Sequence, residues 1–154
     1  MTLDLRELYQ EVILDHHKHP RNRGPLADAT STADGHNPLC GDTITVYVKT
    51  NGGIVDRVSF EGSGCAISTA SASMMTEALH GKSLAEVEEL FRQFQDLVTA
   101  DGPAPTDASL ESELGDLEVL AGVREHPVRI KCATLPWHTM RAALKGAHEP
   151  VTTE

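Results

Sequence analysis

The sequence has no long apolar run, no stretch of basic residues and few aromatic side chains. Aromatic residues make up 4% of the 154 residues, and 13 Lys and Arg against 23 Asp and Glu give a formal net charge of −10. No apolar run is long enough to span a bilayer, and no signal segment stands at the N-terminus. An acidic chain without a basic stripe would repel a nucleic-acid backbone. We therefore expect a soluble, cytoplasmic protein that binds neither nucleic acid nor a membrane.

Cysteine is also scarce, because the chain has only Cys40, Cys65 and Cys132. An odd number does not suit a disulfide framework, and thiols in the cytosol stay reduced. No C-x-x-C pair is present, so the common spacing of zinc ligands is missing. Three roles then remain for these residues, which are buried fillers, catalytic thiols or metal ligands. The filler role is possible because free cysteine behaves as a small hydrophobe.

The length predicts one domain, and no internal repeat divides it. A chain of this size buries roughly 68–70% of its unfolded surface, so it can form a core without disulfides. We expect a single domain over residues 1–148 and a flexible C-terminal tail over residues 149–154, whose sequence is "EPVTTE".

Apolar periodicity predicts a helix followed by an antiparallel meander. Apolar side chains repeat with helical spacing from Leu5 to Ile13. The first half of residues 28–42 is predicted to be an edge strand and the second half a loop. Alternating side chains predict a strand over residues 43–50, and "NGG" predicts the hairpin turn to a return strand.

Helical patterns return after Cys65. They predict a helix over residues 66–79 and another over residues 84–94, which begins with a capping box of Ser83 and Glu86. The stretch after Pro127 is predicted to be extended and to become a helix from Cys132 to Lys145, with Pro136 tolerable only near the first turn.

Each cysteine is thus predicted to lie where regular structure changes. Cys40 falls in the loop before a strand, Cys65 in a glycine-rich loop entering a helix, and Cys132 where an extended stretch becomes a helix. Loops are where scaffolds present functional side chains. Helix N-termini also favour the thiolate form, from which Cys65 and Cys132 would both gain.

Asp42 is the candidate for a fourth ligand. Three converging thiolates leave one position of a tetrahedral soft-metal site to be filled. Residues two apart in a strand point the same way, so Cys40 and Asp42 can reach one ion. A carboxylate is unusual in a structural zinc site and indicates a site that is partly labile. Asp42 as a turn-forming residue and the cysteines as fillers remain the alternatives on residue chemistry alone.

Four motifs together resemble one family of iron–sulfur assembly proteins, the SufU/IscU/NifU N-domain family. They are "LYQEVILDHHKHPRNRG", "NPLCGD", "GSGCAISTASASMM" and "VRIKCATLPW". The resemblance covers nearly the whole chain. It implies an α+β fold, an IscU/NifU-like sandwich in which a three-stranded antiparallel sheet carries helices packed on one face and the cysteines cluster at one end.

Two details of the sequence are similar to those of the SufU branch of the family, whose members are zinc-dependent sulfurtransferases. Scaffold-type members have a His before the third cysteine, where this chain has Lys131, and an "LPPVK" motif where this chain has "EHPVRIK". The segment between the second and third cysteines is also long. By resemblance, Cys40, Asp42, Cys65 and Cys132 bind one Zn²⁺.

The resemblance further implies sulfur transfer from a pyridoxal-phosphate-dependent cysteine desulfurase of the SufS type, and delivery to downstream SUF scaffold proteins. In that family a histidine of the desulfurase is thought to replace one cysteine on zinc, and the freed thiol takes the sulfur. We assign this catalytic role to Cys40, with Cys132 as the runner-up. Arg129 and Lys131 either steady negative charge on the moving sulfur or are simply solvated.

Two alternatives stay open. The same ligands suit iron, so the protein is alternatively a scaffold on which a [2Fe–2S] cluster is assembled and passed on. The third hypothesis is an interaction module that zinc stabilises and that has no transfer chemistry.

Overall fold

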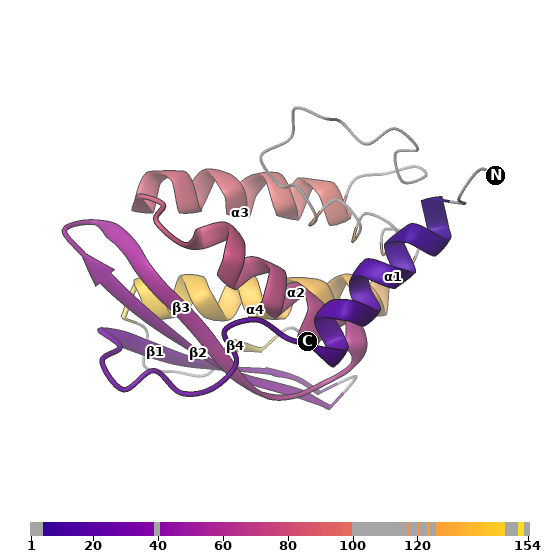
Figure 1. Ribbon diagram of the computed structural model, residues 1–154, viewed down its shortest axis with the longest axis horizontal. Coiled ribbons are helices and arrows are strands. Elements are labelled where there is room, and N and C mark those ends of the chain that lie inside the picture. The colour runs from indigo at the N-terminus through magenta and orange to yellow at the C-terminus, as the bar shows by residue number, and fades with distance from the viewer. Residues whose placement is uncertain are drawn as a thin grey trace.

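A small antiparallel sheet forms one layer of the molecule and helices form the other (Figure 1). The structure, a computed structural model, describes residues 5–38, 41–99, 117, 120, 123, 126–146 and 151–152. The elements in chain order are α1 (Leu5–Lys18), β1 (Ser31–Asn37), β2 (Asp42–Asn51), β3 (Ile54–Ser63), α2 (Ala66–Leu79), α3 (Leu84–Thr99), α4 (Pro127–Leu144) and β4 (Val151–Thr152).

The three strands β1, β2 and β3 form the predicted antiparallel meander, which confirms the α+β fold. The strand order in the sheet is β3-β2-β1-β4. The two-residue β4 adds a parallel strand beside β1, with Gly35 opposite Val151. This pairing falls inside the segment for which the sequence predicts a tail. No helix in the described ranges is long and apolar enough to cross a membrane.

The position of β1 differs from the prediction. The strand begins at Ser31 and continues to Asn37, through a segment predicted to be a loop. Its register with β2 is continuous from Ser31 opposite Val48 to Asn37 opposite Asp42. The pairing of β1 with β2 supplies hydrogen bonds that offset the weak strand propensity of the residues in β1. Gly35 suits this strand because a Cβ there would lie 2.0 Å from Thr139 Oγ1 of α4.

One face of the sheet carries the helices. Helix α4 packs on β1 and β2, and α2 packs on β3 and α4, while α3 lies farther from the sheet and α1 lies against α2 (Figure 1). Alternate residues of β2 and β3 point into this layer, and the buried ones include Val46, Val48, Val58 and Phe60. The core is therefore a single cluster between sheet and helices.

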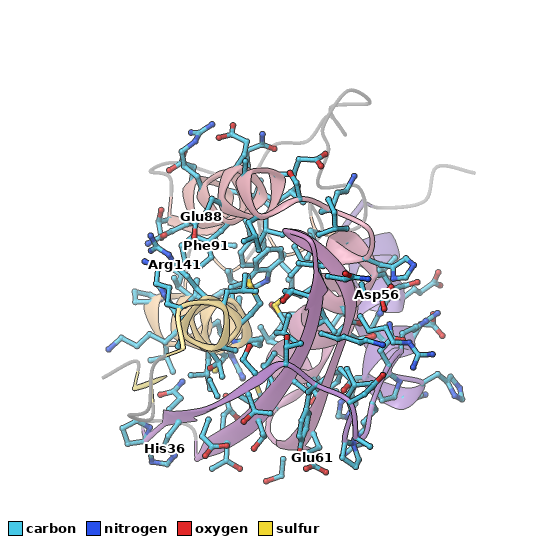
Figure 2. All side chains as sticks on the ribbon, turned by 90° about the vertical axis from the view of Figure 1, so that its left-hand side faces the viewer. His36, Asp56, Glu61, Glu88, Phe91 and Arg141 are labelled. Carbon is cyan, nitrogen blue, oxygen red and sulfur yellow. The ribbon has the colours of Figure 1, made fainter. Side chains whose placement is uncertain are left out.

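Aromatic contacts join α3 to α4. The Phe94 and Trp137 rings stack with centroids 4.7 Å apart. The Arg141 guanidinium lies 5.1 Å from the centroid of Phe91 and its Nε is 3.3 Å from a carboxylate oxygen of Glu88 (Figure 2). These contacts fix α4, and with it the helix face that reaches the end of the sheet.

The predicted capping box at the start of α3 is confirmed. The Ser83 N–H donates to Glu86 Oε1 at 3.0 Å, and the Glu86 N–H donates to Ser83 Oγ at 3.2 Å. Local side-chain bonds of this kind depend only on residues three apart, which is why the sequence predicts them well.

Candidate metal centre

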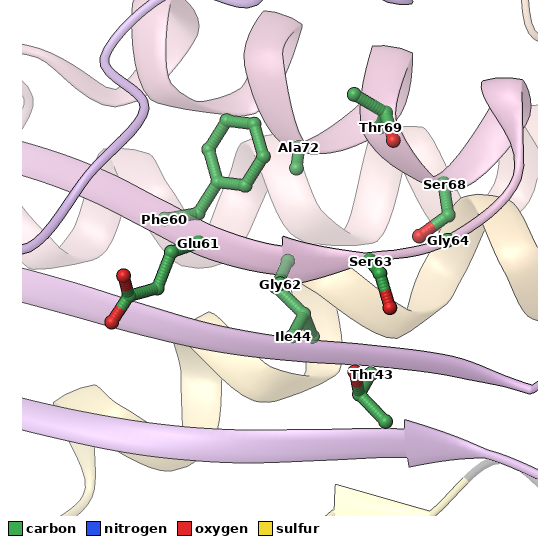
Figure 3. Close-up of a pocket in the computed structure, with 10 residues that line it drawn as sticks. All are labelled: Thr43, Ile44, Phe60, Glu61, Gly62, Ser63, Gly64, Ser68, Thr69 and Ala72. Atoms are coloured by element: carbon green, nitrogen blue, oxygen red, sulfur yellow. The ribbon is translucent and has the colours of Figure 1, made fainter.

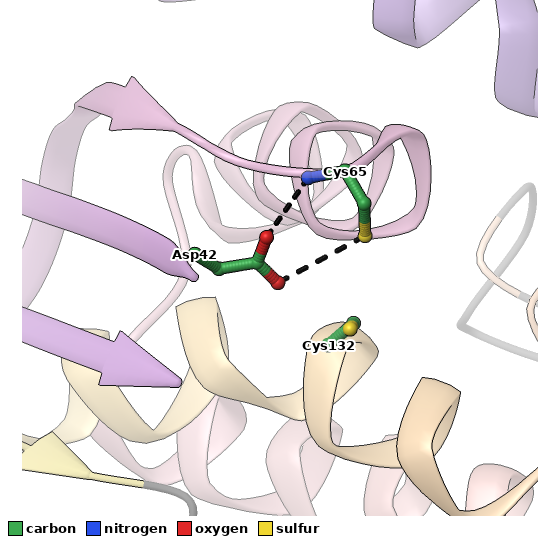
Figure 4. Close-up of side chains that lie close together, drawn as sticks. All are labelled: Asp42, Cys65 and Cys132. Carbon is green, nitrogen blue, oxygen red and sulfur yellow. Dashed lines mark hydrogen bonds between the residues drawn. The ribbon is translucent and has the colours of Figure 1, made fainter. Parts of the chain in front are cut away.

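Asp42, Cys65 and Cys132 meet at one end of the sheet (Figure 4). Asp42 is the first residue of β2, Cys65 is the N-cap of α2, and Cys132 lies in α4. One ligand atom from each side chain lies within 4.8 Å of the other two. Within the part of the chain that the structure describes, no other group of three such residues is brought together. The structure thus joins three of the four predicted ligands.

The Asp42 carboxylate is buried, with 1% of the residue exposed. Its Oδ1 accepts the backbone N–H of Cys65 at 2.9 Å, and its Oδ2 lies 3.8 Å from Cys65 Sγ (Figure 4). A buried carboxylate is costly unless it is paired, hydrogen-bonded or bound to a metal. A side chain that only formed a turn would not need to be buried between two thiols, so this geometry favours a ligand role.

Cys65 caps helix α2, as the sequence predicts. Its backbone is extended, with φ −72° and ψ 170°, and its Sγ accepts the Ser68 N–H at 3.4 Å. The sulfur therefore occupies the position that Ser, Thr or Asp usually takes at a helix N-terminus. It thus provides an acceptor for one of the N–H groups that a helix leaves without a partner in its first turn.

Gly62 and Gly64 shape the turn that brings Cys65 to Asp42 (Figure 3). Gly62 has φ +141°, and a Cβ there would lie 2.2 Å from the Thr43 carbonyl oxygen. A Cβ on Gly64 would lie 2.9 Å from Asp42 Oδ1. The sequence predicts only that these glycines allow a change of direction, whereas the structure shows that Gly64 makes room for the carboxylate.

The prediction for Cys132 is wrong in one respect. Helix α4 begins at Pro127, so Cys132 lies in its second turn and not at its N-terminus. Proline suits the first helical position, and packing of the helix on β1 and β2 outweighs the weak strand preference of Val128 and Ile130. The helix dipole falls off within the first turn, so it does little for Cys132.

Pro136 is also placed differently from the prediction. It lies inside α4, four residues after Cys132, and it is buried. Because proline has no N–H, the usual helical hydrogen bond to the Cys132 carbonyl cannot form. The helix continues to Leu144 despite this cost, which falls about one turn after Cys132.

Asn37 is a residue of the site that the sequence analysis missed. It is fully buried, and its Nδ2 donates to Cys132 Sγ at 3.7 Å. In "NPLCGD" an asparagine before proline looks like an ordinary turn residue. No local signal connects it to a cysteine that lies 95 positions later.

Cys40 lies outside the described residues. It stands two positions before Asp42 in the sequence. The prediction that it shares one ion with Asp42 therefore stays a prediction. Arg129 is exposed one turn before Cys132 on α4, and Lys131 is half-buried; their proposed effect on a moving sulfur also stays a prediction.

The donor set fits zinc. Two sulfur atoms and a carboxylate oxygen are accepted zinc ligands, at about 2.3 Å for sulfur and about 2.0–2.2 Å for oxygen. Ligand atoms within 4.8 Å of one another can all reach one ion with small side-chain rotations. Three ligands leave one tetrahedral position, which Cys40 can supply from its place two residues before Asp42.

The sequence of this chain is similar to the sequences of known proteins. The family model described as NifU-like N terminal domain matches residues 8–133. The zinc-dependent sulfurtransferase SufU of Bacillus subtilis is 45% identical over 137 residues, which are 89% of this chain and 89% of that protein. The iron-sulfur cluster assembly scaffold protein IscU of Streptococcus pyogenes is 42% identical, over 92% of this chain and 85% of that protein.

A solved structure has the same fold. The crystal structure of an iron-sulfur cluster assembly scaffold protein for the SUF system, from Fervidobacterium islandicum AW-1, superimposes with a TM-score of 0.78. It is 34% identical, and the match covers 90% of this chain and 98% of that chain. The fold of this chain is therefore shared with that protein.

Proposed function

The chain belongs to the NifU-like N-terminal domain family, and on this premise we propose that it is a zinc-dependent sulfur acceptor, a sulfurtransferase of iron–sulfur cluster assembly in the cytoplasm. The sulfur comes from the persulfide of a cysteine desulfurase. The observation that carries the proposal is the convergence of Asp42, Cys65 and Cys132. The identity of 45% to a zinc-dependent SufU supports this branch of the family.

Four residues of this chain would hold the metal, namely Cys40, Asp42, Cys65 and Cys132. Bound zinc would keep the thiolates deprotonated and protect them from oxidation until a partner docks. The chain itself supplies the remaining electrostatics. The Cys65 and Ser68 N–H groups hold Asp42 and Cys65 in place from the start of α2.

The chemistry is thiol–persulfide exchange. The Cys40 thiolate attacks the outer sulfur of the desulfurase persulfide, so a new sulfur–sulfur bond forms on Cys40 while the old one breaks. The desulfurase cysteine leaves as a thiolate, and the persulfide proton stays on the transferred sulfur. No external oxidant or reductant is needed, because the outer sulfur keeps its oxidation level.

The carrier must be accessible, and this requirement favours Cys40. Cys132 is fully buried in a helix and Cys65 caps another helix, so both are parts of packed elements. Cys40 lies directly before Gly41, which has φ +72°. A thiol in a connection between strands can reach an external sulfur with less disruption than one in a helix interior.

The partner we propose is a pyridoxal-phosphate-dependent desulfurase of the SufS type, with downstream SUF scaffold proteins receiving the sulfur. Arg129 lies one helical turn before Cys132 and is exposed, so its charge can steady negative charge on an incoming persulfide. Lys131 is half-buried, which makes it the weaker candidate.

The deciding experiment compares Cys40→Ser with Cys132→Ser. Each variant is mixed with a SufS-type desulfurase and cysteine, and alanine release and the site of added sulfur are measured by peptide mass spectrometry. We expect wild-type protein to carry one extra sulfur on Cys40 and to stimulate alanine release. Cys40→Ser should abolish both. Unchanged stimulation by Cys40→Ser would contradict the proposal.

The IscU relatives favour a second function, assembly of a [2Fe–2S] cluster on the same residues. Thiolates suit iron as well as zinc, so ligand type does not separate the two. Anaerobic reconstitution with iron and sulfide separates them. A stable cluster that transfers to an apo-ferredoxin would support the scaffold function, whereas retained zinc and no transferable cluster would support the sulfur acceptor.

A further inference from the structure

The buried amide of Asn37 contacts the candidate metal centre at Cys132. Asn37 ends β1, on the strand next to the one that Asp42 begins, and the two residues are register partners. Its side chain is fully buried and donates to Cys132 Sγ at 3.7 Å. A buried polar side chain is retained only where its hydrogen bonds repay its loss of hydration.

The main chain of Asn37 makes a second contact beside the site. Its carbonyl oxygen accepts the Gly41 N–H at 2.8 Å. Gly41 has φ +72°, a conformation that other residues rarely adopt. One residue thus contacts the buried Cys132 through its side chain and Gly41 through its main chain.

We propose that Asn37 is a positioning residue that holds Cys132 as the permanently bound ligand, so that Cys40 is the thiol that leaves. The inference rests on the proposed function. An amide is suited to this role because it donates a hydrogen bond to sulfur without adding charge. The bond limits the rotation of the Cys132 side chain.

The residue type matters at this position. Leucine has a similar size but no donor, so Asn37→Leu removes the hydrogen bond with little change in volume. Serine retains a hydroxyl on a shorter side chain that does not reach the sulfur, and it provides a second variant if the leucine variant folds poorly. Aspartate is unsuitable as a test, because its carboxylate could itself bind the metal.

Thr139→Val provides the matched control. Thr139 is fully buried in α4, the helix that contains Cys132, and its hydroxyl donates to the Leu135 carbonyl at 2.7 Å. The change therefore removes one buried side-chain hydrogen bond from α4 without touching the ligands. Any effect of general destabilisation should appear in both variants.

Two measurements test the role without a desulfurase. Zinc affinity is measured by competition with a chromogenic chelator, and the alkylation rates of Cys65 and Cys132 are measured in zinc-free protein. Loss of Asn37 should weaken zinc binding about 10- to 100-fold, the usual effect of removing an outer-shell partner. It should also raise the alkylation of Cys132 relative to Cys65, while Thr139→Val changes neither. Equal results for Asn37→Leu, Asn37→Ser and Thr139→Val would overturn the proposal.

A third measurement separates this proposal from the proposed function. After reaction with a desulfurase, added sulfur should be found on Cys40 alone in wild-type protein and on both Cys40 and Cys132 in Asn37→Leu. Sulfur confined to Cys40 in both proteins would overturn the role of Asn37 and leave the sulfur-acceptor function intact. If wild-type protein accepts no sulfur but Asn37→Leu alters zinc affinity, the sulfur-acceptor function is overturned and the role of Asn37 stands.

Discussion

Asp42 and Cys65 are connected twice, once through the main chain and once through side chains. The Cys65 N–H donates to one carboxylate oxygen at 2.9 Å, and the other carboxylate oxygen lies 3.8 Å from the sulfur. The carboxylate thus has one oxygen bound to the main chain and a second oxygen that faces the Cys65 sulfur. This arrangement allows the structural and metal-binding roles of Asp42 to be separated by mutation.

Asp42→Asn should weaken zinc binding and leave the zinc-free fold nearly intact. Asparagine keeps an oxygen that can accept the Cys65 N–H but has no negative charge for the metal. Asp42→Ala should also destabilise the zinc-free protein by about 1–3 kcal/mol, because the Cys65 N–H loses its acceptor. Elemental analysis gives the zinc content and urea unfolding gives the stability. Equal zinc content in wild-type protein and Asp42→Asn would show that the carboxylate does not bind the metal.

Gly64→Ala should displace the Asp42 carboxylate and lower zinc affinity. The added Cβ would lie 2.9 Å from Oδ1 and 3.2 Å from both Cγ of Asp42 and Oγ of Ser68. These distances are too short, so the carboxylate must move. Ser63→Ala, at an exposed neighbouring position, is the control. Chelator competition on both variants tests the prediction, which an unchanged affinity of Gly64→Ala would refute.

Removal of zinc should lower the melting temperature without unfolding the protein at room temperature. Zinc bound only to the folded state stabilises it by mass action. The sheet and helices share one buried apolar cluster that does not include the ligands, so the core remains when the metal is removed. Circular dichroism with and without a chelator measures both effects. A chelated protein that is unfolded at 25 °C would contradict this prediction.

Stability of the zinc-free protein should fall as pH decreases below about 6.5, because of His138. Burial, and then the nearby charge of Arg141, lower the pKa of His138 from its ordinary value of 6.5. The unfolded chain therefore binds a proton at a higher pH than the folded chain does, and acidification favours unfolding through this window. The loss ends once the pH is below the folded-state pKa.

Urea unfolding of the zinc-free protein between pH 8 and pH 5 tests this prediction. His138→Gln should reduce the slope of stability against pH, because glutamine does not titrate. His80→Gln, which changes an exposed histidine, is the control for the replacement of an imidazole ring by an amide. The prediction is refuted if the two variants and the wild-type protein show the same slope.

Much of this protein follows from local sequence patterns. The capping box of Ser83 and Glu86, the hairpin after Asn51 and the helix that begins behind Cys65 all depend on residues close together in the chain. The resemblance of the cysteine motifs indicates the fold class and the ligand set. These features are predictable because hydrophobic periodicity and turn chemistry act over a few residues.

The start of α4, the strand at residues 31–37 and the role of Asn37 are decided by tertiary structure alone. Residues 127–131 look extended, yet packing on β1 and β2 makes them helical and places Cys132 in a helix interior. Asn37 meets Cys132 only because β1 and α4 pack together. Residue types thus determine which side chains can bind a metal. Long-range packing decides which of these side chains come together and which neighbouring residue positions each of them.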